Sequence, residues 1–242
     1  KKNINFYTII FILWTVTFTI FISGERISIF IHLIFCLFGG SILRKKINFY
    51  KIVLFSSISA IILFLSFDHL RERVINQTIN QITNNQVIFD NDGNLIDRDK
   101  DVFVYLSVHH DAHARSAIKM FISKPIFGHG PKNFRNVCKD YEYNQFSCTT
   151  HPHNIYLQLL SETGIIGVVF LLFAIFSILY ILKKEFKGKN SVSIKILSAY
   201  MLLYFIPFLP SGNFFNNFVN VNFYTILGIY LFLINYNKKT IS

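Results

Sequence analysis

Apolar residues gather in six long runs separated by polar stretches: 6–23, 27–43, 50–67, 164–182, 194–209 and 219–236. A helix that crosses the ~30 Å hydrocarbon core of a membrane needs roughly 20 mostly apolar residues, and each run reaches or approaches that length. Pro207, Asn220 and Asn222 lie near the ends of the last two runs, where neighbouring helices can satisfy the backbone. The pattern predicts an all-α polytopic membrane protein with about six transmembrane helices.

The longest polar stretch divides the chain into three parts. We expect three transmembrane helices in 1–67, a large loop in 68–163 and three further transmembrane helices in 164–242. Within the loop, 87–96 alternates around an Asp-Gly pair, which predicts a β-hairpin, and 111–124 has helical spacing that ends before Pro125. Because the chain opens on Lys1 without Met, we interpret it as the C-terminal part of a longer polytopic protein.

The net charge of +11 is confined to alternate loops. Basic residues gather at 1–2, 44–51, 183–195 and 238–239, whereas 68–152 carries equal numbers of acidic and basic residues. Cytoplasmic loops of membrane proteins carry such an excess of Lys and Arg. The pattern therefore predicts that both ends of this chain are cytoplasmic and that the large loop lies outside. It excludes nucleic-acid binding, since no basic face remains to be explained.

The polar chemistry is densest at the mouth of the fourth apolar run. The residues from 151 to 164 bring together imidazole, amide, phenol and carboxylate groups: His151, His153, Asn154, Tyr156 and Glu162. Histidine is suited to proton transfer near neutral pH, which suggests an enzyme. Its position at the end of a membrane helix suggests a lipid-linked substrate. His151 either takes part directly or supports the turn at Pro152. Glu162 either orients a histidine or the substrate, or is simply a carboxylate at a helix end.

Four further groups in the loop are candidates. The amides of Gly128 and Gly130 either face an anion or form a structural turn, and Arg135 follows as a candidate substrate-binding cation. His109, His110, Asp111 and His113 lack convincing metal-ligand spacing; contact with a glycan or phosphate is the better interpretation, and solvated surface is the better one for His113. For Asp90, Asp92, Asp97 and Asp99, a polar hairpin tip is a better interpretation than a calcium site. Cys138 and Cys148 are expected to bridge in an oxidising compartment, which would stabilise the fold by roughly 2–3 kcal/mol.

Two blocks resemble the O-antigen ligase and O-antigen polymerase superfamily. The first is Ala117-x-x-Met120-Phe121-x-x-x-Pro125-Ile126-x-Gly128-x-Gly130-Pro131-x-x-Phe134. The second is His151-x-His153-Asn154-x-Tyr156-Leu157-x-x-Leu160-x-Glu162-x-Gly164-x-x-Gly167. The turn Ser23-Gly24-Glu25-Arg26, between two apolar runs, is similar to a short outward turn of that family.

The resemblance implies a GT-C-like transferase of the bacterial inner membrane, with its large loop in the periplasm. Such enzymes move a glycan from undecaprenyl pyrophosphate to an acceptor, invert the anomeric centre and need no metal or cofactor. His153 matches the family histidine and becomes the candidate that activates the acceptor hydroxyl, and Arg26 matches an arginine for the donor pyrophosphate. A second family arginine falls near His110 when counted back from Pro125, so Arg115 is a candidate without a match.

The acceptor is left open by the resemblance. Lipid A-core would make the chain a ligase of lipopolysaccharide biosynthesis, a glycan repeat unit would make it a polymerase, and a protein would make it an O-oligosaccharyltransferase. A lipid or polysaccharide transporter would carry charged residues within its spans, whereas the polar groups here gather in the loop. A binding module without catalysis is the remaining alternative.

Overall fold

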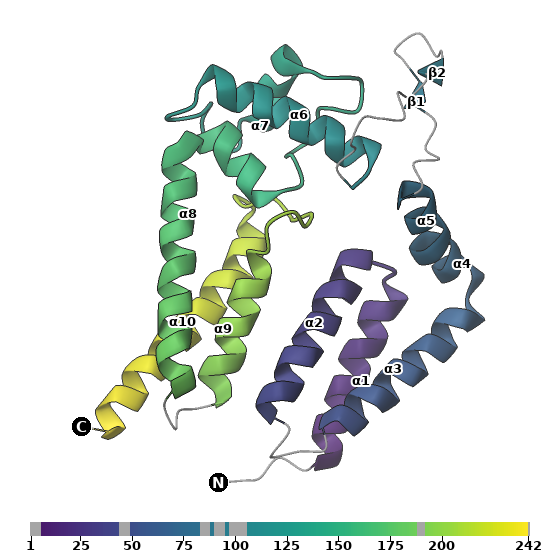
Figure 1. Ribbon diagram of the computed structural model, residues 1–242, viewed down its shortest axis with the longest axis vertical. Coiled ribbons are helices and arrows are strands. Elements are labelled where there is room, and N and C mark those ends of the chain that lie inside the picture. Colours follow the sequence, from purple (N-terminus) through teal and green to yellow (C-terminus); the bar gives the residue numbers. More distant parts are fainter. Residues whose placement is uncertain are drawn as a thin grey trace.

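The computed structural model describes residues 6–43, 49–82, 88–89, 95–96, 106–187 and 192–241 (Figure 1). The elements follow the apolar runs and the loop between them: α1 (Phe6–Ile22), α2 (Arg26–Leu43), α3 (Phe49–Ser66), α4 (Asp68–Arg71), a π-helical turn (Glu72–Asn76), α5 (Gln77–Ile82), β1 (Ile88–Phe89), β2 (Leu95–Ile96), α6 (Val108–Ser123), α7 (Phe134–Val137), a 3₁₀ turn (Cys138–Tyr141), α8 (Ile155–Lys187), α9 (Val192–Tyr204) and α10 (Asn217–Ile241).

The long helices form two groups of three. Helices α1–α3 lie together, α8–α10 lie together, and α2 packs on α9 to join the groups (Figure 1). Helices α6 and α7 lie across one end of α8 and form, with their connecting loops, the polar cap (residues 106–154). The α1–α2 turn, α4–α5 and residues 205–216 gather at the same end, whereas α1 begins and α10 ends at the opposite one.

Two of these units have a buried apolar cluster. Residues of α8, α9 and α10, with Phe205 just after α9, form the first: Ile155, Leu159, Leu171, Ile178, Ile194, Met201, Phe205 and Tyr230. The cap buries a smaller cluster of Ala117, Met120, Phe134 and Cys138. Cys138 is bonded to Cys148, with 5.6 Å between their Cα atoms. The cap therefore combines a small core with a covalent link, as expected for a unit with little apolar area to bury.

One helix among the described residues, Ile155–Lys184, is long and apolar enough on its own to cross a membrane. Its aromatic side chains face outward, with Phe170, Phe173 and Phe176 at 71%, 73% and 64% exposure. Contiguous exposed apolar surface of this kind marks a membrane contact. Helices form at all six predicted runs. The stretches Arg26–Leu37 and Val192–Tyr204 are apolar but shorter, so length and apolarity support one of the six predicted spans.

Two boundaries differ from the sequence prediction. The run 194–209 yields a helix only to Tyr204, and residues 205–216 form an irregular segment before α10. The fourth helix begins at Ile155, nine residues before its predicted start, and bends at Gly164.

The strands β1 and β2 pair antiparallel, Ile88 opposite Ile96 and Phe89 opposite Leu95. Asp90, Asp92, Asp97 and Asp99 lie outside the described residues, as do the basic residues at 1–2 and 44–46.

The bend in α8 is the place where the cap docks. Gly164 has φ 66° and ψ −162°, a conformation essentially restricted to glycine. A Cβ atom on Gly164 would meet the backbone of Ile126, and one on Gly128 would meet the backbone of Glu162. The amide of Ile165 donates to the carbonyl of Pro125 at 2.8 Å. The bend thus exists because two backbones cross in direct contact, which only glycines permit.

Replacing Gly164 by Ala should destabilise the junction. The new methyl group meets backbone atoms in a conformation that costs about 1–3 kcal/mol for other residues, so the thermal midpoint of the detergent-solubilised protein should fall. Gly228→Ala is the matched control, because nothing lies within 4 Å of its Cβ position in α10. This control should gain about 0.5–1 kcal/mol from helix propensity. Equal midpoints for the two variants would contradict the crossing.

Candidate functional site

Four imidazoles converge within the cap, with His153 at their centre. Its ring centroid lies 4.2 Å from that of His151, 5.4 Å from that of His113 and 5.9 Å from that of His110. Two of these rings come from α6 and two from the loop that leads into α8. The sequence singled out three of the four as site residues, and His113, interpreted there as surface, is buried with them.

Helix α6 carries His110 and His113 on one face because they are three residues apart. The helix starts at Ser107, whose hydroxyl accepts a hydrogen bond from the amide of His110 at 3.3 Å, as an N-cap residue does. The same hydroxyl lies 2.7 Å from Nδ1 of His110. His113 Nδ1 lies 2.8 Å from the carbonyl oxygen of Ser147. The N-cap and the 147 loop therefore fix both rings.

Residues 205–216 hold the other two histidines. The carbonyl oxygen of Ser211 lies 3.3 Å from Nε2 of His151, and its amide donates to the carbonyl of His153 at 2.8 Å. His153 has φ 54°, a conformation that is uncommon outside glycine. Asn154 caps α8 by accepting from the amides of Tyr156 and Leu157, and its own amide donates to the carbonyl oxygen of Leu209 at 3.3 Å. This segment was not identified from the sequence as part of the site.

Burial keeps the imidazoles neutral. It lowers the pKa of His153 to about 4, with smaller contributions from the neighbouring His151, His113 and His110. Burial also lowers the pKa of His110 to about 4, followed by the effects of His113, His109 and Arg26. The pKa values of His113 and His151 are lowered as well, mainly by burial. A neutral imidazole offers a lone pair for a proton, so the cluster can act as a base.

Two arginines act electrostatically on the cluster. Arg26, at the start of α2, donates from Nη1 to Thr78 Oγ1 of α5 at 3.2 Å, and its charge contributes to the low pKa of His110. Arg135 is exposed on α7, and its charge helps to lower the pKa of His151. The predicted residues His110, His151 and His153 thus lie together, and Arg26 acts on His110 from a turn 84 positions earlier in the chain.

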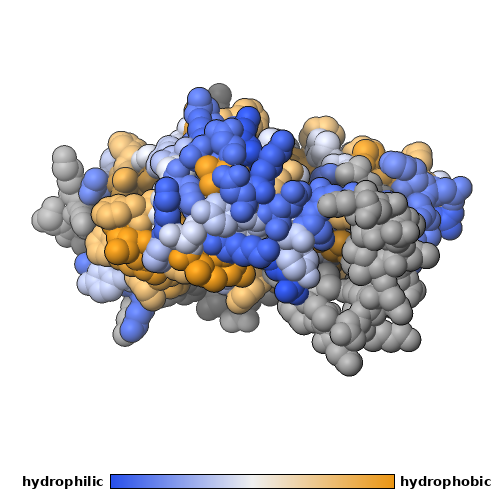
Figure 2. Space-filling view, turned by 90° about the horizontal axis from the view of Figure 1, so that it is seen from above, coloured by the Kyte–Doolittle hydropathy of each residue, from blue (hydrophilic) through white to orange (hydrophobic). Residues whose placement is uncertain are grey.

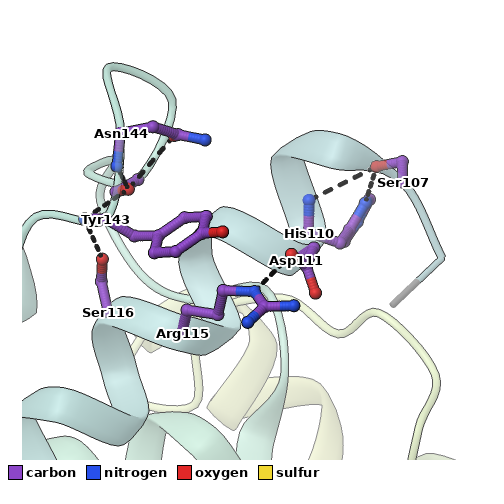
Figure 3. Close-up of polar contacts among 8 residues, drawn as sticks. Ser107, His110, Asp111, Arg115, Ser116, Tyr143 and Asn144 are labelled. Atoms are coloured by element: carbon purple, nitrogen blue, oxygen red, sulfur yellow. Dashed lines mark hydrogen bonds and ion pairs between the residues drawn. The ribbon is translucent and has the colours of Figure 1, made fainter. Parts of the chain in front are cut away.

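Arg115 lies on a neighbouring face of α6. Its Nε contacts Asp111 Oδ2 at 2.7 Å, and its guanidinium carbon lies 4.9 Å from the centre of the Tyr143 ring. Figure 3 shows Arg115 directed along the helix toward Asp111, with Tyr143 beside it. Both charged residues line a cavity of about 580 Å³ between α6, the start of α8 and residues 207–208. His110 rather than Arg115 therefore joins the imidazoles, in agreement with the register counted back from Pro125.

Glu162 is fully buried and ties the cap to α8. Its carboxylate accepts from the amide of Lys132 at 3.1 Å, from the amide of Phe134 at 2.8 Å and from Gln158 Nε2 at 3.0 Å. Gln158 also donates to Asn213 Oδ1 at 2.9 Å. Of the two interpretations from sequence, a carboxylate that merely ends a helix does not account for these three hydrogen bonds. The side chain orients backbone around the site instead of facing the imidazoles.

The glycine turn is structural, which was the alternative to an anion site. The amide of Gly128 donates to the carbonyl of Lys124, that of His129 to Ser161 and that of Gly130 to Glu162. These amides therefore do not face an anion, and the hypothesis that Gly128 and Gly130 bind substrate in this way is corrected. The hydroxyl of Tyr156 donates to the carbonyl of Phe205 at 2.6 Å, so this predicted substrate residue also helps to hold the segment 205–216.

A sequence model of the O-antigen ligase family matches residues 11–172, about two thirds of the chain. The chain belongs to the O-antigen ligase family. Proteins of this family reside in the inner membrane and act as glycosyltransferase-like enzymes on glycans and lipid-linked substrates, and the apolar helix Ile155–Lys184 fits that location. No curated protein and no solved structure matches the chain.

The O-antigen ligase match includes α6, the glycine turn and the start of α8, and thus all four imidazoles. It ends before residues 205–216, which hold His151, His153 and Gln158 in place. A break of Pro, Ser, Gly and Asn between two apolar runs was the sequence signal for this segment. In the part of the chain that the structure describes, no group of three or more His, Cys, Asp or Glu is arranged to hold a metal ion.

Glu162→Gln should loosen the cap from α8. One of the two backbone amides would then face an amide NH₂ group, and a buried donor without its acceptor costs about 1–3 kcal/mol. Hydrogen exchange of the amides from 128 to 136 should accelerate, with less change inside α6. Glu142→Gln, a substitution at an exposed position of the same cap, is the control. Unchanged exchange in Glu162→Gln would show that the carboxylate is not the link.

Proposed function

We propose that this chain is an O-antigen-ligase-like glycosyltransferase. It transfers a glycan from undecaprenyl pyrophosphate to lipid A-core or another acceptor at the periplasmic face, with inversion and without a metal. The observation that carries the proposal is the convergence of neutral imidazoles on His153, with Arg26 supplied by a distant turn. Transfer from a pyrophosphate requires a base for the acceptor and cations for the leaving group, and the cluster with Arg26 can supply both.

His153 is the base in this mechanism. Its imidazole nitrogen removes the proton from the acceptor hydroxyl as that oxygen bonds to the anomeric carbon of the donor. The bond from this carbon to the pyrophosphate oxygen breaks, and its electron pair leaves with the pyrophosphate. Because attack and departure occur on opposite sides of the carbon, the anomeric configuration inverts. The low pKa of His153 ensures that it starts neutral.

The negative charge that develops on the pyrophosphate needs cationic partners. Arg26 acts on His110 from one side of the cluster, and Arg135 acts on His151 from another. Guanidinium groups bind phosphate oxygens in a forked geometry and keep their charge at all physiological pH values. His110 supplements them, since an imidazole N–H donates to an anion and becomes a stronger base when the anion is bound.

The arrangement of the ends supports a periplasmic site. In Figure 1, the cap and the α1–α2 turn lie at one end, and the start of α1 and the end of α10 lie at the other. The sequence places its basic clusters beside the latter end, as cytoplasmic loops require. Figure 2 shows hydrophilic residues gathered over the cap, with hydrophobic residues flanking them. We therefore propose a multi-pass protein with its cap in the periplasm.

A complementation experiment identifies which acceptor the enzyme uses. The full-length protein is expressed in strains that lack either the ligase or the polymerase, and lipopolysaccharide is separated on a gel. A ladder capped on lipid A-core is expected from a ligase. Longer chains in the polymerase-deficient strain would assign polymerisation instead. No change in either strain, with the protein present in the membrane, would refute both activities.

His153→Asn should abolish transfer. Asparagine tolerates the positive φ of this position but removes the imidazole, so the fold is retained while the base is lost. Loss of a general base lowers the rate by about 10²–10⁴-fold. His69→Asn is the control, because this histidine is exposed on α4. Full activity in a folded His153→Asn protein would remove His153 from the mechanism.

The acid limb of the pH profile should lie far below that of an ordinary histidine. The value of kcat/KM follows the pKa of the free enzyme, and that of His153 is about 4. Between pH 7 and pH 5 the activity should therefore fall by only about a tenth, whereas a base with an ordinary pKa of about 6.5 would lose about 25-fold. Transfer assays in nanodiscs over this range distinguish the two. A loss of about 25-fold would contradict a buried neutral base.

A further inference from the structure

A cavity of about 580 Å³ lies beside Asn154, the residue that follows His153 in the chain. Its walls are apolar: Ala114 and Ile118 of α6, Tyr156 and Leu157 of α8, and Pro207 and Phe208. The volume falls within the range of about 300–1,000 Å³ that is usual for small-ligand sites. The mechanism described above does not use this space.

Phe208 is held at the cavity in an unfavourable conformation. Its φ is 69°, in the region that bulky residues rarely adopt, and its side chain is 74% exposed. Glycine would adopt this backbone without strain, so the conformation does not explain a phenylalanine here. A strained backbone at the wall of a cavity supports the hypothesis of a function at the residue.

The two charged residues that line the cavity form one pair. The side chain of Asp111 accepts from Arg115 Nε at 2.7 Å, and the ring of Tyr143 lies against the guanidinium (Figure 3). The exposure of Asp111 is 9%, so the carboxylate is held in one position by its partner and by the helix. An apolar wall with one fixed ion pair matches a ligand that has an apolar face and a polar edge.

We propose that this cavity binds one sugar ring of the acceptor, stacked on Phe208 with its hydroxyl groups directed to Asp111 and Arg115. A pyranose has the required form, because its C–H groups make an apolar face and its hydroxyls lie along the edge. The proposal rests on the proposed function and extends it: the cavity places the acceptor ring beside Asn154, so that one of its hydroxyls reaches His153. Phe208, Asp111 and Arg115 are then specificity residues.

Other occupants fit less well. A hydrocarbon chain would cover the ion pair with apolar groups and remove its remaining water, which is costly for charges. A phosphate would meet the carboxylate of Asp111, and cationic groups are instead provided at the cluster by Arg26 and Arg135. A sugar edge satisfies both partners of the pair, since a hydroxyl donates to a carboxylate and accepts from a guanidinium.

The test measures binding separately from transfer. The full-length protein in nanodiscs is titrated with methyl β-glucoside and methyl β-galactoside, with geraniol as a hydrocarbon probe, and contacts are read by saturation-transfer difference NMR. Phe208→Gly removes the ring and relieves the positive φ. It should therefore keep or raise the thermal midpoint while weakening binding of the glycoside by about tenfold, the equivalent of 1.4 kcal/mol.

Two variants on α6 complete the comparison. Ala114→Phe fills the cavity and should abolish the glycoside signal, whereas Ile122→Phe, at an exposed position on the same helix, should leave it unchanged. The proposal is overturned if the wild-type protein gives no glycoside signal, or if Phe208→Gly and Ile122→Phe bind equally well. It is also overturned if Ala114→Phe abolishes the signal of geraniol and leaves the signal of the glycosides unchanged.

The outcomes separate this proposal from the proposed function. If the protein binds glycosides in the cavity but restores no ladder, the sugar site is supported and the transferase function is refuted. If it transfers glycan and Phe208→Gly leaves the KM for the acceptor unchanged, the transferase function is supported and the sugar site is refuted. With both correct, Phe208→Gly raises the KM for the acceptor and leaves the KM for the lipid-linked donor unchanged.

Discussion

The hydrogen bonds of the buried Glu162 carboxylate fix the position of the cap on α8. The carboxylate accepts from two backbone amides of the cap, at Lys132 and Phe134, and from Gln158 one turn earlier in α8. A charge is retained in such a site only when its hydrogen bonds are complete, so the two chains must meet in one register. Since α6 ends just before this turn, the same contact also sets where its histidines lie.

The imidazole cluster is assembled from separate segments of the chain rather than from one helix face. Helix α6 provides two rings, the loop before α8 provides two, and Ser211 holds the latter pair from the far end of the chain. The amide of Ser211 stabilises the unusual backbone of His153 by donating to its carbonyl. The geometry of the proposed base thus depends on a segment beyond the residues that match the O-antigen ligase family.

The sequence predicted those features that have a local signal. Apolar runs located the long helices, Pro125 marked the end of α6 within two residues, and the spacing from Pro125 pointed to His110. The bend at Gly164 was missed because glycine is common inside membrane helices and only the crossing chain makes it necessary. The contacts of Asn213 with Gln158 and of Ser211 with His151 join residues 55 and 60 positions apart, and no periodicity reveals such pairs.

The disulfide between Cys138 and Cys148 adds an order of events to this architecture. Disulfides form in oxidising compartments and are kept reduced in the cytosol. The bond closes beside Phe134, one of the residues through which the cap is anchored to α8. With the cap in the periplasm, as proposed, the bond closes only after the two thiols have left the cytosol, so completion of the cap follows insertion of the helices. Maturation of the proposed site is then coupled to its export.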